Sequence, residues 1–362
     1  MKICFLAPAN SAHTIKWCNY FVSRKHEVHV ISLTEGEISG VQVHLLKSKA
    51  SAKGSDLQKL MYLTTAGQVH RLIQEISPDI VNAHYATSYG TVAALAGLNN
   101  YVLSVWGSDI FDFPRKSPIH RAMLQFSLSR AKYLFSTSKA MAEEAARYTK
   151  KKFEITPFGV DMELFSPAKR NREEDGYFII GTVKSLAPDY GIDTLLRAAA
   201  IVKQNHPEIP LRVRIAGKGP NEEEYHALAL QLGLDVEWLG FISQEQAAQE
   251  WANMDVAVIC SNNESFGVAA VEAQSCGCPV IISQIPGLME ATCPGRSSVT
   301  VPAGDAPKLA DAIFQLFSEN DRRKQLGSNG REYVAEHYEI KSCFKKVESL
   351  FEKYIEGNRS DR

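Results

Sequence analysis

The chain carries, at residues 255–273, the stretch DVAVICSNNESFGVAAVEA. Its first part, DVAVIC (255–260), is a short apolar run typical of a buried strand, and its last part, from residue 267 on, has the composition of a buried helix. A polar segment with one glycine, Gly267, joins the two. A strand that passes through a polar loop into a helix is half of a β-α-β unit, so this stretch predicts a parallel sheet covered by helices.

The same alternation of apolar runs and helix-like stretches extends through the chain in two blocks. In the first block we expect strands at 2–7, 27–33, 41–46, 79–84, 101–106, 132–137 and 152–155, and helices at 14–25, 56–76, 87–97, 118–131 and 138–148. In the second block we expect strands at 177–184, 211–217, 235–240, 255–260, 279–283 and 298–301, and helices at 192–205, 221–232, 243–252, 267–276, 305–318, 320–336 and 340–356.

A turn-rich, charged stretch without a clear period, 157–176, separates the blocks and predicts a linker between domains. The sequence therefore predicts an α/β protein made of two doubly wound, Rossmann-like lobes with a central cleft. Ligands in such sheets bind beyond the carboxyl ends of the strands.

Composition narrows the function classes. The 362 residues include 40 Lys and Arg against 41 Asp and Glu, a balance that points to no nucleic-acid partner. No apolar run approaches the roughly 18–20 residues needed to span a bilayer. The N-terminal run lacks the features of a secretory signal, and the seven scattered cysteines indicate reduced thiols. We expect a cytoplasmic protein, and the sequence shows no clustered metal ligands.

Charge is unevenly distributed. Residues 1–165 hold 19 Lys and Arg against 13 Asp and Glu, and residues 166–362 hold 21 against 28. Much of the first excess lies in the segment 115–152, and a further basic stretch contains Lys47, Lys49, Lys53 and Lys59. Two interpretations stay open: ordinary solvated helix faces, or a basic surface that meets anionic lipid headgroups or a phosphorylated acceptor.

Two carboxylates flank the loop of the opening stretch. Glu264 lies just before the predicted helix and Glu272 lies inside it, roughly 9 Å further along the axis at the rise of an α-helix. The free backbone N–H groups at the start of a helix bind anions, and carboxylates accept hydrogen bonds from sugar hydroxyls. Such a pair suits the two ends of a nucleotide sugar. In the alternative interpretation, Glu264 only complements the helix dipole and Glu272 is a surface acid.

The spacing of Glu264 and Glu272 resembles the E-x7-E motif of the retaining glycosyltransferases of family 4, which have the GT-B fold. Neighbouring segments are also similar to this family, over most of 157–305, whereas 1–156 is similar only loosely. The similar segments are Pro157–Asp161, Gly181–Leu195, Ile215–Pro220, Trp251–Ser261, Ala273–Ile281 and Ile285–Glu290.

The resemblance implies a role for each matching residue of the second lobe. Glu272 would hold the donor ribose and Glu264 would lie at the donor sugar. Lys184 would neutralise the leaving diphosphate, as a fixed cation stabilises charge that develops in a transition state. The remaining donor-binding residues would be the backbone of Phe266, Gly267 and Val268 at the diphosphate and sugar hydroxyls, and the loop of Gly217, Lys218 and Gly219 at the nucleotide base.

The family generally has a second lysine six residues after the first, and this chain has Tyr190 there. Loss of one cation at a diphosphate should weaken donor binding or leaving-group stabilisation by about 1–3 kcal/mol, unless another group such as Lys218 replaces it. We therefore expect lower activity unless such a replacement is present.

The first lobe offers candidates for the acceptor or the cleft. Asn10 and His13 lie in the loop Pro8–Thr14 that follows the first strand, where this chain lacks the family's glycine pair. His84 ends the strand at 79–84, and Trp106 and Asp109 follow the strand at 101–106. Trp106 stands where the family commonly has His, and we expect it to stack on a sugar or to pack in the core.

The resemblance also implies an organisation and partners. We expect an acceptor-binding lobe at 1–164, a nucleotide-sugar-binding lobe at 165–338 and a terminal helix at 339–357 that crosses back to the first lobe. The expected reaction is metal-independent, cofactor-free hexosyl transfer from a nucleotide sugar, UDP-sugar being favoured. The acceptor would be a hydroxyl of a lipid-linked sugar or other glycan precursor in polysaccharide biosynthesis, with peripheral attachment to the inner face of the membrane.

Three alternatives differ in class. A nucleotide-sugar epimerase or a glycoside phosphorylase can share the fold. A relative with weakened catalysis that only binds sugar nucleotides is favoured by Tyr190. A dinucleotide oxidoreductase is disfavoured because no G-x-G-x-x-G follows the first strand.

Overall fold

The chain divides into two compact units. The computed structural model describes residues 1–48, 61–172 and 175–360. The first unit comprises Met1–Phe158 together with the C-terminal segment from Lys341, and the second comprises Gly159–Ile340. The boundary lies at Phe158, six residues before the predicted one at 164. Of the second basic stretch, Lys49, Lys53 and Lys59 lie outside the described residues, as does the start of the helix expected at 56–76.

The first unit is built on a parallel sheet of seven strands. Their order across the sheet is β3-β2-β1-β4-β5-β6-β7, so the winding direction reverses between β1 and β4. Every strand expected in this block is present, each within a residue of its expected bounds. The strands are β1 (Lys2–Leu6), β2 (Glu27–Ser32), β3 (Gln42–Leu45), β4 (Ile80–His84), β5 (Tyr101–Val105), β6 (Tyr133–Ser136) and β7 (Phe153–Ile155).

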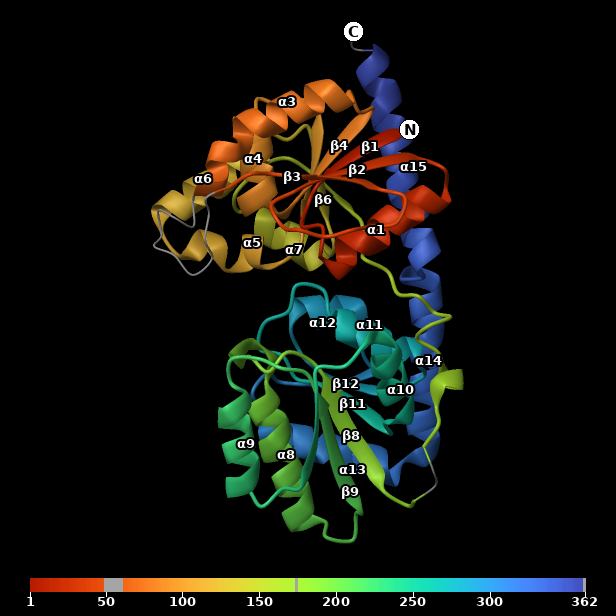
Figure 1. The fold of residues 1–362 in the computed structure, drawn as a ribbon. Coiled ribbons are helices and arrows are strands. Elements are labelled where there is room, and N and C mark those ends of the chain that lie inside the picture. The colour runs from red at the N-terminus through yellow and green to blue at the C-terminus, as the bar shows by residue number, and fades with distance from the viewer. Residues whose placement is uncertain (49–60, 173–174, 361–362) are drawn as a thin grey trace. The chain divides into compact units, whose positions relative to one another are not determined.

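The helices of this unit lie on both sides of its sheet (Figure 1). Ser117, followed by Pro118, begins α6 as expected: its side chain accepts the backbone N–H of His120. The helices are α1 (Ala12–Ser23), η1 (Met61–Thr65), α3 (Ala66–Ile76), η2 (Tyr85–Tyr89), α4 (Gly90–Leu95), α5 (Ser108–Phe111), η3 (Phe113–Arg115), α6 (Pro118–Arg130), α7 (Lys139–Ala145) and α15 (Ile340–Ser360).

The second unit has a parallel sheet of six strands in the order β10-β9-β8-β11-β12-β13. Its winding direction reverses between β8 and β11, which pair directly. Both units are therefore Rossmann-like and doubly wound, as the sequence predicts. The strands are β8 (Phe178–Val183), β9 (Leu211–Ala216), β10 (Val236–Gly240), β11 (Val256–Ile259), β12 (Val280–Ser283) and β13 (Ser298–Val301).

The helices of the second unit also cover both faces of the sheet (Figure 1). Two short α-helices, α5 in the first unit and α12 in the second, and the three-residue turns η3, η4 and η5 were not expected. The helices are η4 (Pro167–Lys169), η5 (Pro188–Tyr190), α8 (Ile192–Asn205), α9 (Glu222–Gln231), α10 (Gln244–Asn253), α11 (Val268–Ser275), α12 (Pro286–Ala291), α13 (Ala306–Ser318) and α14 (Asn320–His337). Among the described residues no helix is both long enough and apolar enough to span a bilayer.

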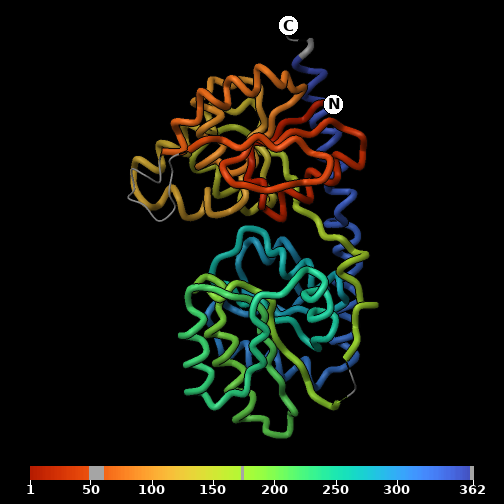
Figure 2. The backbone as a smooth tube through the Cα atoms, in the orientation of Figure 1, coloured from red at the N-terminus to blue at the C-terminus, as the bar shows by residue number. Residues whose placement is uncertain are grey.

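The C-terminal helix α15 packs on the first unit. Figure 2 shows it, in blue, running alongside the red N-terminal segment. The Phe351 ring stacks on Phe21 with centroids 5.6 Å apart, and Phe344 meets Trp17 edge-on at 5.7 Å. Burial of each such aromatic side chain contributes roughly 1.5–3 kcal/mol, so α15 completes the apolar core of this unit.

One buried carboxylate fixes the register of α15 against α1 and β2. Glu348 is 5% exposed and accepts hydrogen bonds from Tyr20 Oη at 3.0 Å, Arg24 Nε at 3.3 Å and His26 Nε2 at 2.7 Å. Burial acts to raise the pKa of Glu348, but the hydrogen bonds from His26, Tyr20 and Arg24 outweigh it, and the pKa lies below its ordinary value.

We expect Glu348→Ala to destabilise the first unit by about 1–3 kcal/mol, because three donors lose their common acceptor. A carboxyl whose pKa is lowered by folding stabilises the protein at pH values above its unfolded pKa, and that contribution disappears as the pH falls through the folded pKa. The difference in melting temperature between wild type and Glu348→Ala, large near neutral pH, should therefore shrink in acid. Glu352→Ala, at an exposed position of the same helix, is the control. An equal loss in both variants at all pH values would contradict the assignment.

Candidate functional site

The candidate residues of the second unit gather where its sheet reverses direction. Lys184 follows β8 directly, and the loop that contains Glu264 follows β11. Because β8 and β11 are parallel neighbours, these two loops leave the same edge of the sheet side by side. This is the place at which doubly wound sheets bind ligands.

The glycine loop lies against the segment of Lys184. The backbone N–H of Lys184 donates to the carbonyl of Ala216 at 2.9 Å. Gly217 has φ +137°, and a Cβ there would stand 1.9 Å from the carbonyl oxygen of Lys184. A Cβ on Gly219 would stand 2.3 Å from the carbonyl oxygen of Leu186. The two glycines are thus required for the close approach of two backbones, a role that the sequence did not specify.

Lys184 and Glu264 form an ion pair between the two loops. Their side chains are 13% and 11% exposed, so both charges are largely removed from water. The ammonium of Lys184 also lies 4.4 Å from the centroid of the Tyr190 ring. A cation, a carboxylate and an aromatic face therefore meet at the edge of the sheet.

The Glu264 loop is fixed by backbone contacts on both sides. The N–H of Asn262 donates to the carbonyl of Asp189 at 2.7 Å, and its Nδ2 donates to the carbonyl of Pro188 at 3.3 Å. On the other side, a Cβ on Gly287 would stand 2.2 Å from the carbonyl oxygen of Glu264. Little room is left for the backbone of this loop to move.

The start of α11 is anchored by Phe266. This side chain is 2% exposed and meets the Tyr338 ring edge-on at 5.1 Å. Gly267 follows at φ +92°, a left-handed conformation that favours glycine, and the helix begins at Val268. The side chain of Phe266 is thus an anchor, and only its backbone is available to a ligand.

Glu272 occupies the open side of α11. Most side chains of this helix are buried, whereas Val268 and Glu272 are partly exposed. Residues four apart share one face of a helix, so Glu272 lies on the same face as the helix's first residue. Lys218 is exposed on the glycine loop.

In the first unit, three of the predicted residues form an aromatic cluster beyond β1, β4 and β5. The His13 ring lies 5.7 Å from Trp106, and the His84 ring lies 4.2 Å from Trp106. Two further rings belong to this cluster: Phe158 stacks on His13 at 4.0 Å, and Tyr85 meets Trp106 edge-on at 5.0 Å. Sequence analysis did not select Tyr85, which follows His84, and it included Phe158 only as part of the family-like segment Pro157–Asp161.

Burial keeps both histidines neutral. It lowers the pKa of His13 to about 4, with a smaller contribution from Lys16, and lowers the pKa of His84 to about 3, with a smaller contribution from His13. His13 is partly exposed, whereas His84 is fully buried and its Nε2 bonds Asn82 Oδ1 at 3.0 Å. Sequence analysis named His84 as a candidate for contact with the acceptor or the cleft. Direct contact with an acceptor does not fit the enclosed position of its side chain.

Asp109 holds two loops in place. Its side chain is 1% exposed, and its oxygens accept the backbone N–H groups of Ala86 at 2.8 Å, Gly107 at 2.8 Å and Trp106 at 3.2 Å. Burial raises its pKa, although these hydrogen bonds favour the carboxylate. The carboxylate of Asp109, a candidate for the acceptor or the cleft, is thus engaged by the turns after β4 and β5. Asn10 is exposed, and its Oδ1 accepts a bond from Thr34 Oγ1 at 3.1 Å.

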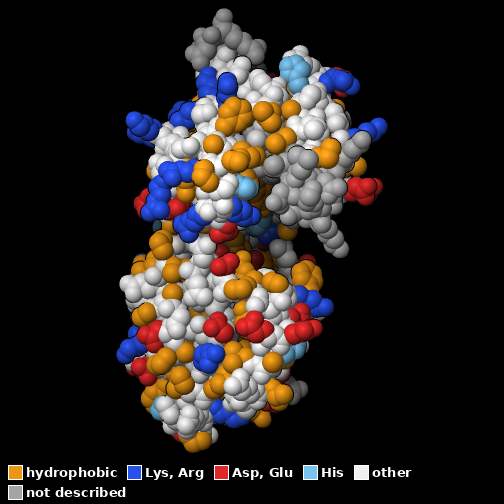
Figure 3. All heavy atoms as spheres, turned by 90° about the vertical axis from the view of Figure 1, so that its left-hand side faces the viewer, with side chains coloured by type: hydrophobic (Ala, Val, Ile, Leu, Met, Phe, Trp, Pro, Cys, Tyr) orange, Lys and Arg blue, Asp and Glu red, His pale blue; other side chains and the backbone are white. Residues whose placement is uncertain are grey.

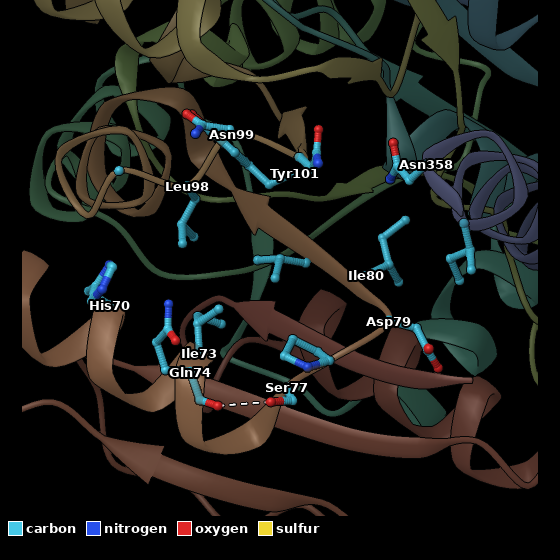
Figure 4. Close-up of a pocket in the computed structure, with 15 residues that line it drawn as sticks. His70, Ile73, Gln74, Ser77, Asp79, Ile80, Leu98, Asn99, Tyr101 and Asn358 are labelled. Atoms are coloured by element: carbon cyan, nitrogen blue, oxygen red, sulfur yellow. Dashed lines mark hydrogen bonds between the residues drawn. The ribbon is translucent and has the colours of Figure 1, made fainter. Parts of the chain in front are cut away.

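A further hollow of about 560 Å³ lies at the opposite edge of the first sheet. Figure 4 shows Asp79 and Asn99 on segments that precede β4 and β5, and Ser77 bonded to the carbonyl of Gln74. Ligands of such sheets bind at the carboxyl ends of the strands, so we do not assign the substrate to this hollow. Among the described residues, no group of three or more His, Cys, Asp and Glu side chains is arranged to hold a metal ion.

Comparison with known proteins identifies the family of this chain. A profile described as "Glycosyl transferase 4-like" matches residues 2–138, and one described as "Glycosyl transferases group 1" matches residues 166–333. The chain belongs to the group 1 glycosyltransferases of family 4 type. This confirms the resemblance drawn from the Glu264–Glu272 segment, and the matches extend it to the first unit.

Curated relatives of this group 1 glycosyltransferase include two D-inositol 3-phosphate glycosyltransferases. That of Corynebacterium jeikeium is 33% identical over 228 residues, which cover 58% of this chain and 54% of the relative. That of Pseudarthrobacter chlorophenolicus is 26% identical over 300 residues, which cover 72% and 70%. The chain thus spans about half the length of the first relative.

Solved structures place this group 1 member in the GT-B fold. The sucrose-phosphate synthase of Thermosynechococcus elongatus has a TM-score of 0.82 at 20% identity, covering 99% of this chain and 100% of that one. Anabaena HepE in complex with UDP and glucose has a TM-score of 0.80 at 20% identity, covering 97% and 99%. At this identity the likeness concerns the fold.

A substitution at Gly191 can test how closely the segment of Tyr190 packs against the end of β11. It has φ +65°, and a Cβ there would stand 2.0 Å from the carbonyl oxygen of Cys260. Gly304 has a similar φ of +73° with nothing within 4 Å of such a Cβ. Since the left-handed conformation costs alanine about 1–2 kcal/mol and overpacking about 1–3 kcal/mol more, Gly191→Ala should destabilise the second unit clearly more than Gly304→Ala.

Chemical denaturation of both variants measures the difference. Equal losses of unfolding free energy would show that a Cβ on Gly191 is accommodated beside Cys260 without cost, and would contradict the close contact between the two backbones.

Proposed function

We propose that the chain transfers a hexose from a nucleotide-sugar donor to a hydroxyl acceptor, with retention of the anomeric configuration and without a metal ion. The observation that carries the proposal is the meeting of Lys184 and Glu264 at the edge where β8 and β11 end, beside the glycine loop and the start of α11. A fixed cation, free helix amides and a carboxylate at one place suit a diphosphate joined to a sugar.

The donor would lie along the second unit. The backbone N–H groups at Gly267 and Val268 would hold the diphosphate, and Glu272, on the open face of α11, would accept hydrogen bonds from the ribose hydroxyls. Lys184 would turn from Glu264 to the diphosphate, leaving Glu264 beside the sugar. The base would rest against the loop of Gly217–Gly219, which the close packing of both glycines on the backbone of Lys184 and Leu186 holds at the edge of the sheet.

The proposed reaction breaks the bond between the anomeric carbon and the phosphate oxygen and forms a bond from that carbon to the acceptor oxygen on the same face. The acceptor proton passes to the departing phosphate oxygen, so no separate base is required. The departing diphosphate gains negative charge, which Lys184 and the helix amides stabilise. These groups supply the charge that a metal ion provides in other enzymes, which supports metal independence.

UDP-sugars are the first donors to test. Three of the similar solved structures are of one protein, Anabaena HepE, in complex with UDP, with UDP and glucose, or with UDP-glucose. A nucleotide-sugar donor for this chain is supported by those complexes together with the family.

The acceptor would bind to the first unit. There, His13 is partly exposed at the border of an aromatic cluster that includes Trp106, and aromatic faces bind sugar rings well. Two curated relatives are named D-inositol 3-phosphate glycosyltransferases. A phosphorylated or lipid-linked acceptor would also be attracted by the basic charge of this unit.

The basic residues of 115–152 lie on the surface, which supports peripheral attachment to anionic membranes. Figure 3 shows Lys and Arg side chains gathered on one face of the first unit. Ile119, at the start of α6, is 70% exposed among them. The exposed basic residues of this segment are Arg115, Lys116, Arg121, Arg130, Lys132, Lys139, Arg147, Lys150, Lys151 and Lys152. An exposed apolar side chain among cations suits a lipid interface.

The decisive experiment incubates the full chain with a panel of nucleotide sugars and measures nucleoside diphosphate release with and without sugar or lipid-linked acceptors. We expect one donor to be consumed, an unchanged rate in excess EDTA, and a product whose anomeric proton coupling matches that of the donor. Absence of both binding and turnover with every donor would refute the proposal. Sugar isomerisation without acceptor would favour the epimerase, sugar transfer to phosphate the phosphorylase, and binding without turnover the weakened relative.

Glu272→Ala should raise the donor KM by about 10- to 100-fold, because hydrogen bonds to a charged group contribute about 1.5–3 kcal/mol. Glu332→Ala, at an exposed acidic position on α14, is the matched control and should behave as wild type. An unchanged KM in Glu272→Ala would contradict the ribose contact.

Membrane attachment is measured by co-sedimentation with vesicles of stated phosphatidylserine content. Charge reversal at Arg115, Lys116 and Arg121 should lower binding at least about 10-fold, since each basic residue near an anionic surface contributes about 1 kcal/mol. The same reversal at Lys308, Arg322 and Lys324, exposed on the second unit, should leave binding unchanged. Binding that ignores salt and acidic lipid content would contradict this mechanism.

A further inference from the structure

The Lys184 ammonium has two partners of different kinds. It pairs with the Glu264 carboxylate, and it lies 4.4 Å from the centroid of the Tyr190 ring. An ammonium within about 6 Å of an aromatic face is attracted by the ring quadrupole, and the attraction grows when water is excluded. With only 13% of the Lys184 side chain exposed, water is largely excluded here.

The Tyr190 ring is carried by a segment tied to the Glu264 loop. The carbonyl of Asp189 accepts the N–H groups of Asn262 at 2.7 Å and Asn263 at 3.3 Å. Directly after Tyr190, the carbonyl of Gly191 accepts a bond from Cys260 Sγ at 3.0 Å. The segment that carries the ring and the residues 260–263 that lead to Glu264 are thus hydrogen-bonded to one another on both sides of Tyr190.

The backbone of Lys184 is fixed by Ala216 and Gly217, but its side chain has four flexible carbons. The position of the ammonium is therefore set by whatever holds it. Glu264 can hold it only while the carboxylate has no competing partner, whereas the ring carries no net charge and does not compete with an anion for the cation.

We propose that Tyr190 is a positioning residue for Lys184: its ring keeps the ammonium in place while the cation exchanges Glu264 for an oxygen of the donor diphosphate. The proposal rests on the proposed function and deepens it. In the donor-free chain Glu264 satisfies the cation. With donor bound, the ring remains as the fixed partner, so a single lysine is held where charge develops on the leaving group.

A series of substitutions separates the ring from the hydroxyl. Tyr190→Phe keeps the aromatic face and should stay within about 2-fold of wild type. Tyr190→Leu keeps apolar bulk without the quadrupole and should lower kcat about 3- to 30-fold, with a smaller change in donor KM, because the cation is needed most in the transition state. If Tyr190 had only a structural role, any loss of kcat in Tyr190→Phe or Tyr190→Leu would accompany a loss of stability. The melting temperatures of the two variants measure this stability.

Tyr177 offers a matched control. Its ring lies 3.7 Å from the guanidinium carbon of Arg212, and it precedes β8 at the opposite edge of the same sheet. Tyr177→Leu removes a cation–π contact of the same unit without touching the site, so its kcat should equal that of wild type.

A double-mutant cycle tests whether Tyr190 acts through Lys184. In a Lys184→Met background, Tyr190→Leu should have no further effect on kcat. If it lowers kcat by the same factor as in wild type, Tyr190 acts through another group and the proposal is wrong.

A measurement without substrate separates this proposal from the proposed function. In NMR spectra of the donor-free chain, the ε-methylene protons of Lys184 should be shifted upfield by the ring current in wild type and in Tyr190→Phe, and not in Tyr190→Leu. Absence of this shift in wild type would overturn the positioning role even if the chain is an active transferase. If the upfield shift is present in a chain that shows no turnover, the contact between Lys184 and Tyr190 is supported and only the enzymatic function is refuted.

Discussion

Two neighbouring parallel strands, β8 and β11, carry the candidate donor site of the second unit, because the sheet reverses its winding direction between them. Parallel pairing brings their carboxyl ends to one edge, and opposite winding leaves a space between the loops that follow. Lys184 and Glu264, eighty positions apart in the chain, meet there as a result. The sheet of the first unit reverses its winding direction in the same way, between β1 and β4. The aromatic cluster of the first unit lies at the carboxyl-terminal edge of that unit's own sheet.

Much of this organisation could be predicted from the sequence. The strands were predicted within a residue because buried parallel strands are short, nearly uninterrupted apolar runs. The Glu264–Glu272 segment could be recognised because its glycine and two carboxylates have a fixed spacing along the chain. The helices α5 and α12 escaped prediction because four and six residues are too few to show a helical period.

What could not be predicted depends on where side chains point after a strand ends. His84 and Asp109 follow or end strands at the edge where ligands bind, and this position alone suggested contact with an acceptor. In the structure, His84 is enclosed by aromatic rings and Asp109 is engaged by backbone amides of two turns. The contact between Lys184 and Tyr190 was equally hidden, since it requires the backbone bonds that join two loops distant in sequence.

The first unit is assembled from two separate parts of the chain, because α15 follows the second unit in the sequence and packs on the first. Phe21 and Phe135 both contact Phe351 of that helix. During synthesis, the amino-terminal segment therefore leaves the ribosome with an apolar surface whose cover has not yet been made, and it must wait for the entire second unit to emerge. Folding of the first unit thus requires translation through α15, and a chain terminated before α15 would expose that apolar surface to chaperones and proteases.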